Sequence, residues 1–213
     1  MTNITYDQFN NDFVNKNNIQ YIIGCDEVGT GSCACELVVC GVKADKNDWI
    51  LSGINDSKQL SIKKREELRI QLLKLADEGK FTFHIAERSN NQIDEFGLGA
   101  MLKDAYVEIF HKLYSDDSLI IADGNIKFDG LGVDHMEIMS LVKADTLLPS
   151  VMAASILAKT YRDEKMRNYH LEYPVYGWDK NVGYSTKKHL EAIKKYGLSP
   201  LHRVSYKLKI LNQ

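Results

Sequence analysis

Short apolar runs alternate along this chain with longer segments whose apolar residues recur every three or four positions. The short runs are rich in Val, Ile, Leu, Phe and Cys and have the length of buried β-strands, and the longer segments have the period of amphipathic helices. This order of strands and helices, without an internal repeat, predicts a single α/β domain. We expect strands at residues 21–25, 34–42, 81–86, 118–122 and 136–142, and helices from 61, over 90–114, over 150–170 and near 186–196.

The composition narrows the class of protein. Of the 213 residues, 44% are apolar and 26% are charged, which is the balance of an ordinary globular protein. No apolar run approaches the ~20 residues that a membrane-spanning helix needs, and residues 1–18 are too polar for a secretory signal. We therefore expect a cytoplasmic protein with no membrane partner.

We expect one domain over 1–213, with 1–20 as an extension and about 160–213 as a helical, basic C-terminal region.

The four cysteines lie within sixteen residues of one another, at Cys25, Cys33, Cys35 and Cys40. A zinc site usually combines a close pair of cysteines with a second pair elsewhere in the chain, and this chain has no second pair. We expect these cysteines to be small buried residues of strands in a reducing compartment.

The net charge of −2 hides an uneven distribution. From Ile156 to the end the chain carries 12 Lys and Arg against 5 Asp and Glu, whereas the part before it carries 15 against 24. A basic C-terminal quarter suits a surface that binds a phosphate backbone. Alternatively, these charges alternate along helices and are simply solvated. Charge alone favours this alternative over binding of a phosphate backbone.

Acidic residues follow three of the predicted strands: Asp26 and Glu27 the first, Asp123 the fourth, and Asp145 the fifth. Ligand sites of α/β sheets lie outside strand ends, where these acids could converge. Carboxylates that lie close together repel one another, and a bound cation relieves the repulsion. Ligands that are all oxygen favour Mg²⁺ or Mn²⁺, and two such ions ~4 Å apart hydrolyse phosphodiesters. Alternatively, each acid only forms a turn.

A competing pattern lies next to the first acids. The glycines of the turn from Gly29 to Ala34 fit a dinucleotide-binding motif, which would make the protein an oxidoreductase. That motif needs a helix immediately after the turn to hold the pyrophosphate, and residues 36–42 have a strand pattern instead. A third possibility is a non-catalytic module that binds nucleic acid through the basic C-terminal quarter.

Several motifs together resemble the type 2 ribonucleases H, the group that contains ribonucleases HII and HIII. The resemblance covers about residues 21–206, nearly the whole chain. The matching segments are 24–31 (GCDEVGTG), 55–58 (NDSK), 122–125 (ADGN), 143–145 (KAD), 153–159 (AASILAK), 173–186 (YPVYGWDKNVGYST) and 202–206 (HRVSY).

The resemblance implies a ribonuclease H-like fold, with a mixed five-stranded sheet, flanking helices and a helical C-terminal region. It implies a monomeric endonuclease that uses Mg²⁺ or Mn²⁺ to cut the RNA strand of an RNA–DNA hybrid, or to nick 5′ of a ribonucleotide embedded in DNA. The products are a 5′-phosphate and a 3′-hydroxyl. The residues that match the catalytic, metal-binding acids of the family are Asp26, Glu27, Asp123 and Asp145.

The same resemblance implies a substrate-binding set: Gly29, Thr30, Gly31, Lys58, Lys159, Arg162, Tyr184 and Arg203. The glycine turn would approach the ribose 2′-hydroxyl, and Tyr184 would pack on the neighbouring sugar. Lys159 and Arg162 lie three apart on one helix, where they could hold the phosphate backbone or pair with neighbouring acids. Arg203 is expected mainly to support the structure, with a possible phosphate contact.

The chain departs from the ribonuclease HII pattern in its glycine turn. Thr30 stands where an Arg is usual, and Ala144 stands where a Gly is usual. A Thr between the two glycines is closer to the ribonuclease HIII pattern. The preference between hybrids and single embedded ribonucleotides therefore stays open.

Overall fold

One mixed sheet of five strands forms the centre of the protein in the computed structural model, which describes residues 18–47 and 61–206. The strand order is β3-β2-β1-β4-β5. β1 and β4 are parallel neighbours, as are β4 and β5, whereas β2 is antiparallel to both β1 and β3. The strands are β1 (Tyr21–Val28), β2 (Leu37–Asp45), β3 (Phe81–Arg88), β4 (Ser118–Asp123) and β5 (Ile138–Leu141).

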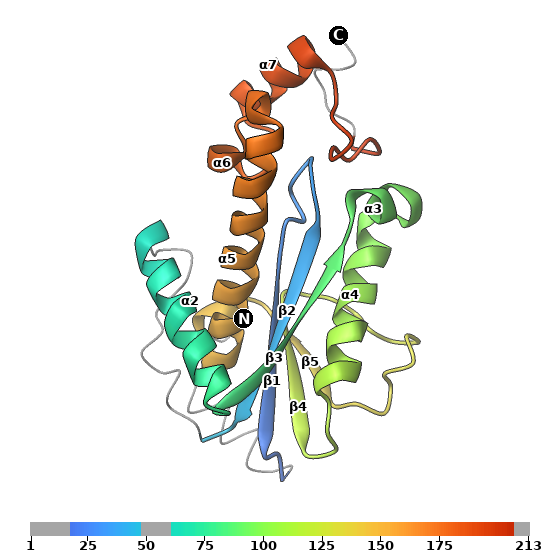
Figure 1. Cartoon of the computed structure of the whole chain (residues 1–213). Coiled ribbons are helices and arrows are strands. Elements are labelled where there is room, and N and C mark those ends of the chain that lie inside the picture. Colours follow the sequence, from blue (N-terminus) through green and yellow to red (C-terminus); the bar gives the residue numbers. More distant parts are fainter. Residues whose placement is uncertain (1–17, 48–60, 207–213) are drawn as a thin grey trace.

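Helices cover both faces of this sheet (Figure 1). On one face lie α2 (Ile62–Asp77) and α5 (Pro149–Glu172), and on the other face lie α3 (Asn90–Phe96) and α4 (Leu98–Leu113). The short C-terminal helices α6 (Trp178–Asn181) and α7 (Lys187–Tyr196) lie beyond the end of the sheet. The short 3₁₀ turns are η4 (Ala144–Thr146) and η5 (Pro174–Tyr176).

The alternation of side chains along the strands divides the core into two layers. Ile23 and Cys25 of β1 pack toward α4, in a cluster with Ile109 and Phe110. Residues of β2 that point the other way pack against α2 and α5. Because both faces of the central strands are buried, they read in sequence as nearly continuous apolar runs.

The predicted fold class is confirmed, since each expected strand and helix overlaps one in the structure. Three elements differ most in their bounds. The second strand, expected over 34–42, is β2 at Leu37–Asp45. The helix expected over 90–114 is broken at Gly97, whose φ of +86° ends α3 before α4 begins. The first strand continues to Val28, so Asp26 and Glu27 lie within β1 rather than after it.

All four cysteines are free and buried, as expected. Cys25 lies on β1 and Cys40 on β2, where the sequence predicts them. Cys33 and Cys35 lie instead in the loop between these strands, and Cys35 has a φ of +64°.

Small residues allow α5 to lie directly on β1. A Cβ atom added at Gly24 would be 2.4 Å from the backbone nitrogen of Val151 and 2.5 Å from the carbonyl carbon of Ser150. Ala153 and Ala154 on the same helix are fully buried. This close crossing brings the next turns of α5 against the end of β1, where the acids lie.

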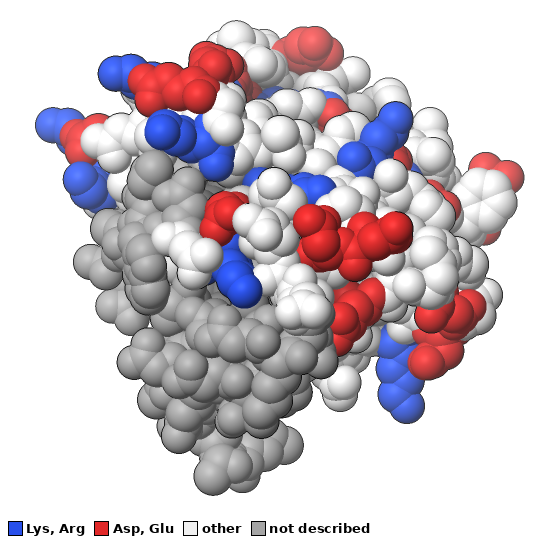
Figure 2. Space-filling view, turned by 90° about the horizontal axis from the view of Figure 1, so that it is seen from below, with Lys and Arg blue, Asp and Glu red and all other residues white. Residues whose placement is uncertain are grey.

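Acidic side chains form several groups over the end of the molecule opposite to α6 and α7, with Lys and Arg scattered between them (Figure 2). None of the described helices is long and apolar enough to cross a membrane.

We predict that Gly24→Ala lowers the free energy of unfolding by at least about 2–3 kcal/mol, because the new methyl group meets backbone atoms that cannot move aside. Chemical denaturation measures the change. Gly99→Ala is the control, since a Cβ there meets nothing within 4 Å, and it should be as stable as the parent or up to about 1 kcal/mol more stable, because Gly99 lies in α4 and alanine favours a helix over glycine. Equal stability of the two variants would contradict the close crossing of α5 and β1.

Candidate active site

A pocket of about 350 Å³ opens where β1 and β4 end. Elements distant in sequence contribute to its wall: two strands, the glycine turn, α2, α5 and the segment before α7. The lining residues are Asp26, Glu27, Val28, Gly29, Thr30, Arg65, Asp123, Ser155, Lys159 and Tyr184. Three of the four predicted catalytic acids therefore meet in one pocket with four of the predicted substrate-binding residues.

The parallel pairing of β1 with β4 brings the acids together. Cys25 lies opposite Ala122 in the register, so the residues that follow, Asp26 and Asp123, lie side by side at the strand ends. The Oδ1 atom of Asp123 accepts a hydrogen bond from the backbone N–H of Ala144 (2.7 Å). This bond joins the end of β4 to the turn that carries Asp145.

Asp26 and Glu27 are held from opposite faces of the sheet, because successive residues of a strand point to opposite sides. Asp26 bonds to the hydroxyl group of Ser155 on α5. Its Oδ1 atom also accepts the backbone N–H of Glu27 (2.8 Å). Glu27 receives a hydrogen bond from Tyr106 on α4 (2.6 Å).

Burial raises the pKa of Asp26 to about 7. Its side chain is 5% exposed, and the negative charges of Glu27 and Asp123 raise the pKa further, against the lowering effect of the Ser155 hydrogen bond. The ionised carboxylates therefore repel one another in the absence of a counter-charge.

Asp145 does not line this pocket. It lies on η4, 1% exposed, directly after the residue that binds Asp123. Lys143 before it has a left-handed backbone (φ +63°), which turns the chain from β5 into η4.

The donors fit a hard divalent cation. Asp26, Glu27 and Asp123 offer only carboxylate oxygens, and their mutual repulsion is what such an ion relieves. Within the described ranges, no three His, Cys, Asp or Glu side chains are close enough to enclose an ion by themselves. This open arrangement suits a divalent cation that keeps part of its hydration, bound by one or two carboxylates and completing its shell with water and substrate phosphate.

Glycine is required in the turn at Gly29. Its φ is +96°, and a Cβ atom there would lie 2.6 Å from the Nε atom of Arg162 and 2.8 Å from the carbonyl oxygen of Glu36. At Gly31 a Cβ would lie 3.3 Å from the ring of Tyr184. The turn is therefore packed against a buried arginine on one side and an aromatic ring on the other.

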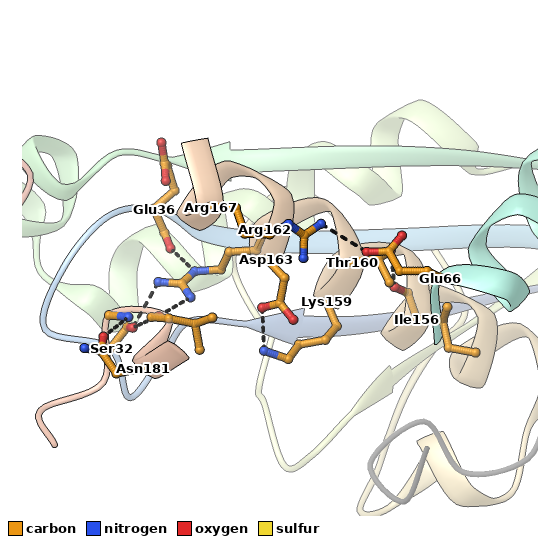
Figure 3. A network of polar contacts seen from close by, with 12 residues as sticks. Ser32, Glu36, Glu66, Ile156, Lys159, Thr160, Arg162, Asp163, Arg167 and Asn181 are labelled. Atoms are coloured by element: carbon orange, nitrogen blue, oxygen red, sulfur yellow. Dashed lines mark hydrogen bonds and ion pairs between the residues drawn. The ribbon is translucent and has the colours of Figure 1, made fainter. Parts of the chain in front are cut away.

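Arg162 contacts the protein backbone rather than the pocket (Figure 3). Its side chain is fully buried. It donates to the carbonyl oxygens of Glu36 (2.9 Å), Val182 (2.8 Å) and Ala34 (3.1 Å) and to the hydroxyl group of Ser32 (2.9 Å). The direct substrate contact expected for Arg162 is thus replaced by a role in holding the glycine turn.

Arg203 holds the same turn from the C-terminal segment. It donates to the carbonyl oxygens of Cys35 (2.9 Å) and Gly29 (2.8 Å), and it is buried. This agrees with the structural support expected for Arg203.

Lys159 donates to Asp163 (2.6 Å), so it pairs with a neighbouring acid, as one of the two alternatives from the sequence expects. It also lines the pocket.

Two polar residues of the pocket were not expected from the sequence in this role. Arg65 on α2 and Ser155 on α5 line the pocket, but one Arg in a charged helix or one Ser among small residues forms no pattern. Lys58 lies outside the described residues.

Two buried histidines support the segment that carries Tyr184. His189 binds the carbonyl oxygen of Tyr184 through Nδ1 (2.8 Å), and its Nε2 atom accepts a hydrogen bond from Trp178 (3.1 Å). His202 accepts the backbone N–H of Ser199 (2.9 Å) and meets His189 through Nε2 (3.1 Å). With both rings neutral, Nε2 of His189 is the acceptor that the N–H groups of Trp178 and His202 share. Burial, with a smaller effect of His189, lowers the pKa of His202 to about 4.

The dinucleotide-binding alternative is not supported. The glycine turn leads through a loop into β2, which is antiparallel to β1, so the helix that would hold a pyrophosphate is not there.

Replacing Asp26 is expected to stabilise the metal-free protein. Because burial raises the pKa of Asp26 to about 7, ionisation costs the folded state free energy as the pH rises from about 4 to 7. Asp26→Asn has no such cost. At pH 8 without divalent metal we expect the variant to gain about 2–4 kcal/mol in stability, and the gain should shrink toward pH 4. Thermal unfolding measures this, with exposed Asp129→Asn as control; no gain at pH 8 would contradict the site's electrostatics.

The histidine pair predicts an unusual titration. His202 should remain neutral well below pH 6 and titrate near pH 4, because its ring is buried beside that of His189. NMR of the histidine side chains measures the midpoint. A midpoint near the ordinary value of about 6.5 would show that the pair is not buried and neutral.

Comparisons with known proteins agree with this architecture. The family model described as Ribonuclease HII matches residues 23–209. Ribonuclease HII of Helicobacter pylori strain G27 is 42% identical over 196 residues, which cover 90% of this chain and 94% of that one. Ribonuclease HII of Clostridium beijerinckii is 40% identical over 196 residues, covering 90% of this chain and 69% of that one.

Solved structures share the fold. Ribonuclease H2 of Pyrococcus horikoshii has a TM-score of 0.74 at 25% identity, covering 88% of this chain and 94% of that one. The RNase HII in the PCNA complex from Archaeoglobus fulgidus has a TM-score of 0.73 at 26% identity, covering 88% and 95%. The resemblance expected from the motifs is therefore confirmed, and the chain belongs to the ribonuclease HII family of type 2 ribonuclease H hydrolases.

Proposed function

We propose that this protein is a divalent-metal-dependent endonuclease that cuts the RNA strand of RNA–DNA hybrids and nicks DNA on the 5′ side of an embedded ribonucleotide. The products are a 5′-phosphate and a 3′-hydroxyl. One observation carries the proposal: Asp26, Glu27 and Asp123 share a pocket with the glycine turn that begins at Gly29. A site for hard cations thus lies beside backbone that can approach a ribose.

Asp26, Glu27 and Asp123 would hold the metal, with Asp145 close behind Asp123 as a further acid. A bound Mg²⁺ or Mn²⁺ supplies Lewis-acid activation of water and neutralises charge on the scissile phosphate. The frame around the carboxylates keeps them near one another before the ion arrives, which lowers the reorganisation needed at the moment of reaction.

The substrate side of the pocket suits a sugar–phosphate backbone. Lys159, which is paired with Asp163, and Arg65 bring cationic groups into the same pocket as the acids. Tyr184 is 41% exposed, and its ring lies beside Gly31, where it can pack on a sugar. Backbone groups of the glycine turn can approach the 2′-hydroxyl, which is the group that distinguishes RNA from DNA.

Thr30 stands where the ribonuclease HII pattern usually has an Arg. It lines the pocket, and its carbonyl oxygen accepts a hydrogen bond from Tyr206 (2.9 Å), so the turn is fixed while a neutral side chain replaces a cation. We propose that the backbone is enough for recognition of a single ribonucleotide. We further propose that residues 1–213 act as one catalytic domain, because the described residues share one sheet and its flanking helices, and that the protein is monomeric and cytoplasmic.

We predict that the purified chain nicks a labelled DNA duplex 5′ of its one ribonucleotide and also cuts an RNA–DNA hybrid, in Mg²⁺ or Mn²⁺. Gel electrophoresis with end-group analysis of the products tests this. Asp123→Asn should lower the rate at least about a hundredfold, because it removes a carboxylate that holds the metal. Asp129→Asn, an exposed acid outside the pocket, should leave the rate unchanged.

Cutting of the hybrid alone would contradict recognition of single ribonucleotides through the backbone of the glycine turn. Binding of both duplexes without cleavage in either metal would contradict the endonuclease and support a non-catalytic module.

A further inference from the structure

A buried tyrosine reaches the acidic site from the far side of the sheet. Tyr106 lies on α4 and is fully buried. Its hydroxyl group donates a hydrogen bond of 2.6 Å to Oε2 of Glu27. It does not line the pocket, so it would touch neither substrate nor metal.

The ring of Tyr106 is fixed by aromatic packing. Its centroid lies 6.0 Å from that of Phe110 and 5.5 Å from that of Phe128, and these two rings meet edge to face at 4.9 Å. A ring clamped in this way has one position for its hydroxyl group. A buried hydroxyl group also costs free energy unless it is hydrogen-bonded, so the fixed ring and the buried hydroxyl group of Tyr106 both favour the bond to Glu27.

Glu27 needs such a support more than Asp26 does. Glutamate has one more rotatable bond than aspartate, and its carboxylate can therefore swing further. Asp26 is held by Ser155 on α5 and by a backbone N–H, whereas Glu27 points toward the other face of the sheet, where α4 supplies Tyr106.

We propose that Tyr106 is a positioning residue that fixes one oxygen of Glu27 and so presets this carboxylate for the divalent cation. The inference rests on the proposed metal-dependent function. The competing explanation is that the Tyr106 hydroxyl group contributes only to core stability. The two explanations differ in what they predict for metal binding. If Tyr106 positions Glu27, loss of its hydroxyl group weakens the affinity for the metal. If the hydroxyl group only stabilises the core, the affinity stays the same.

The test compares two tyrosines that each donate to a glutamate. Tyr106→Phe removes the bond to Glu27 and keeps the ring. Tyr161→Phe removes a similar bond, from Tyr161 to Glu87 (2.5 Å), and neither of these residues lines the pocket. Titration with Mn²⁺, followed by the EPR signal of the free ion, gives the affinity of each full-length variant.

We expect Tyr106→Phe to weaken Mn²⁺ binding about tenfold, as loss of an outer-shell hydrogen bond typically does, and Tyr161→Phe to bind Mn²⁺ like the parent. In the cleavage assay, Tyr106→Phe should need more metal for half-maximal rate, with an unchanged KM for the duplex. Metal affinity equal to that of the parent, or an equal loss in both variants, would overturn the inference.

A second measurement does not depend on the variant folding. With 3-fluorotyrosine incorporated, the ¹⁹F resonance of Tyr106 should shift when Mg²⁺ is added, while that of Tyr161 stays in place. A stationary Tyr106 resonance under saturating Mg²⁺ would overturn the inference alone. Failure of the parent protein to bind Mg²⁺ or Mn²⁺ at all would overturn the proposed function together with it.

Discussion

The repulsion between carboxylates at the adjacent ends of β1 and β4 is the constraint on which the rest of the structure depends. Parallel pairing places Asp26 beside Asp123, and each acid of the pocket is then held by a different element: Ser155 of α5, Tyr106 of α4, and the N–H of Ala144 before η4. The repulsion lowers the stability of the folded protein, and the two apolar layers of the core offset this loss. Such a loss is common where a site is preorganised for a ligand. A hard cation is the partner that removes the repulsion.

The glycine turn depends on a second buried framework. Arg162 and Arg203 donate to carbonyl oxygens of the loop between β1 and β2, and neither forms an ion pair with a residue among those the structure describes. Burial lowers the pKa of Arg162, and the many backbone acceptors offset part of that cost. Two positive charges therefore lie behind the turn that would face a phosphate backbone. They also join the C-terminal segment to the catalytic end of the sheet.

Much of this arrangement could be predicted from the sequence, for identifiable reasons. The strands are buried on both faces and read as apolar runs, and the acids at their ends are visible because they interrupt those runs. The break at Gly97 is hidden, since helical periodicity continues on both sides of it. The burial of Arg162 was not predictable, because a surface arginine and a buried one look alike in a helix. Tyr106 was predictable only as part of a helix, because its bond to Glu27 joins residues 79 positions apart.

The central claim is that this constellation of carboxylates is a cation site. Crystals soaked in Mn²⁺ and measured at the manganese absorption edge test it most directly, because anomalous scattering locates the ion without assumptions about its ligands. The account predicts an anomalous peak within coordination distance of Asp26, Glu27 or Asp123, in the pocket beside Gly29. A peak elsewhere on the protein, or none at saturating Mn²⁺, would contradict it.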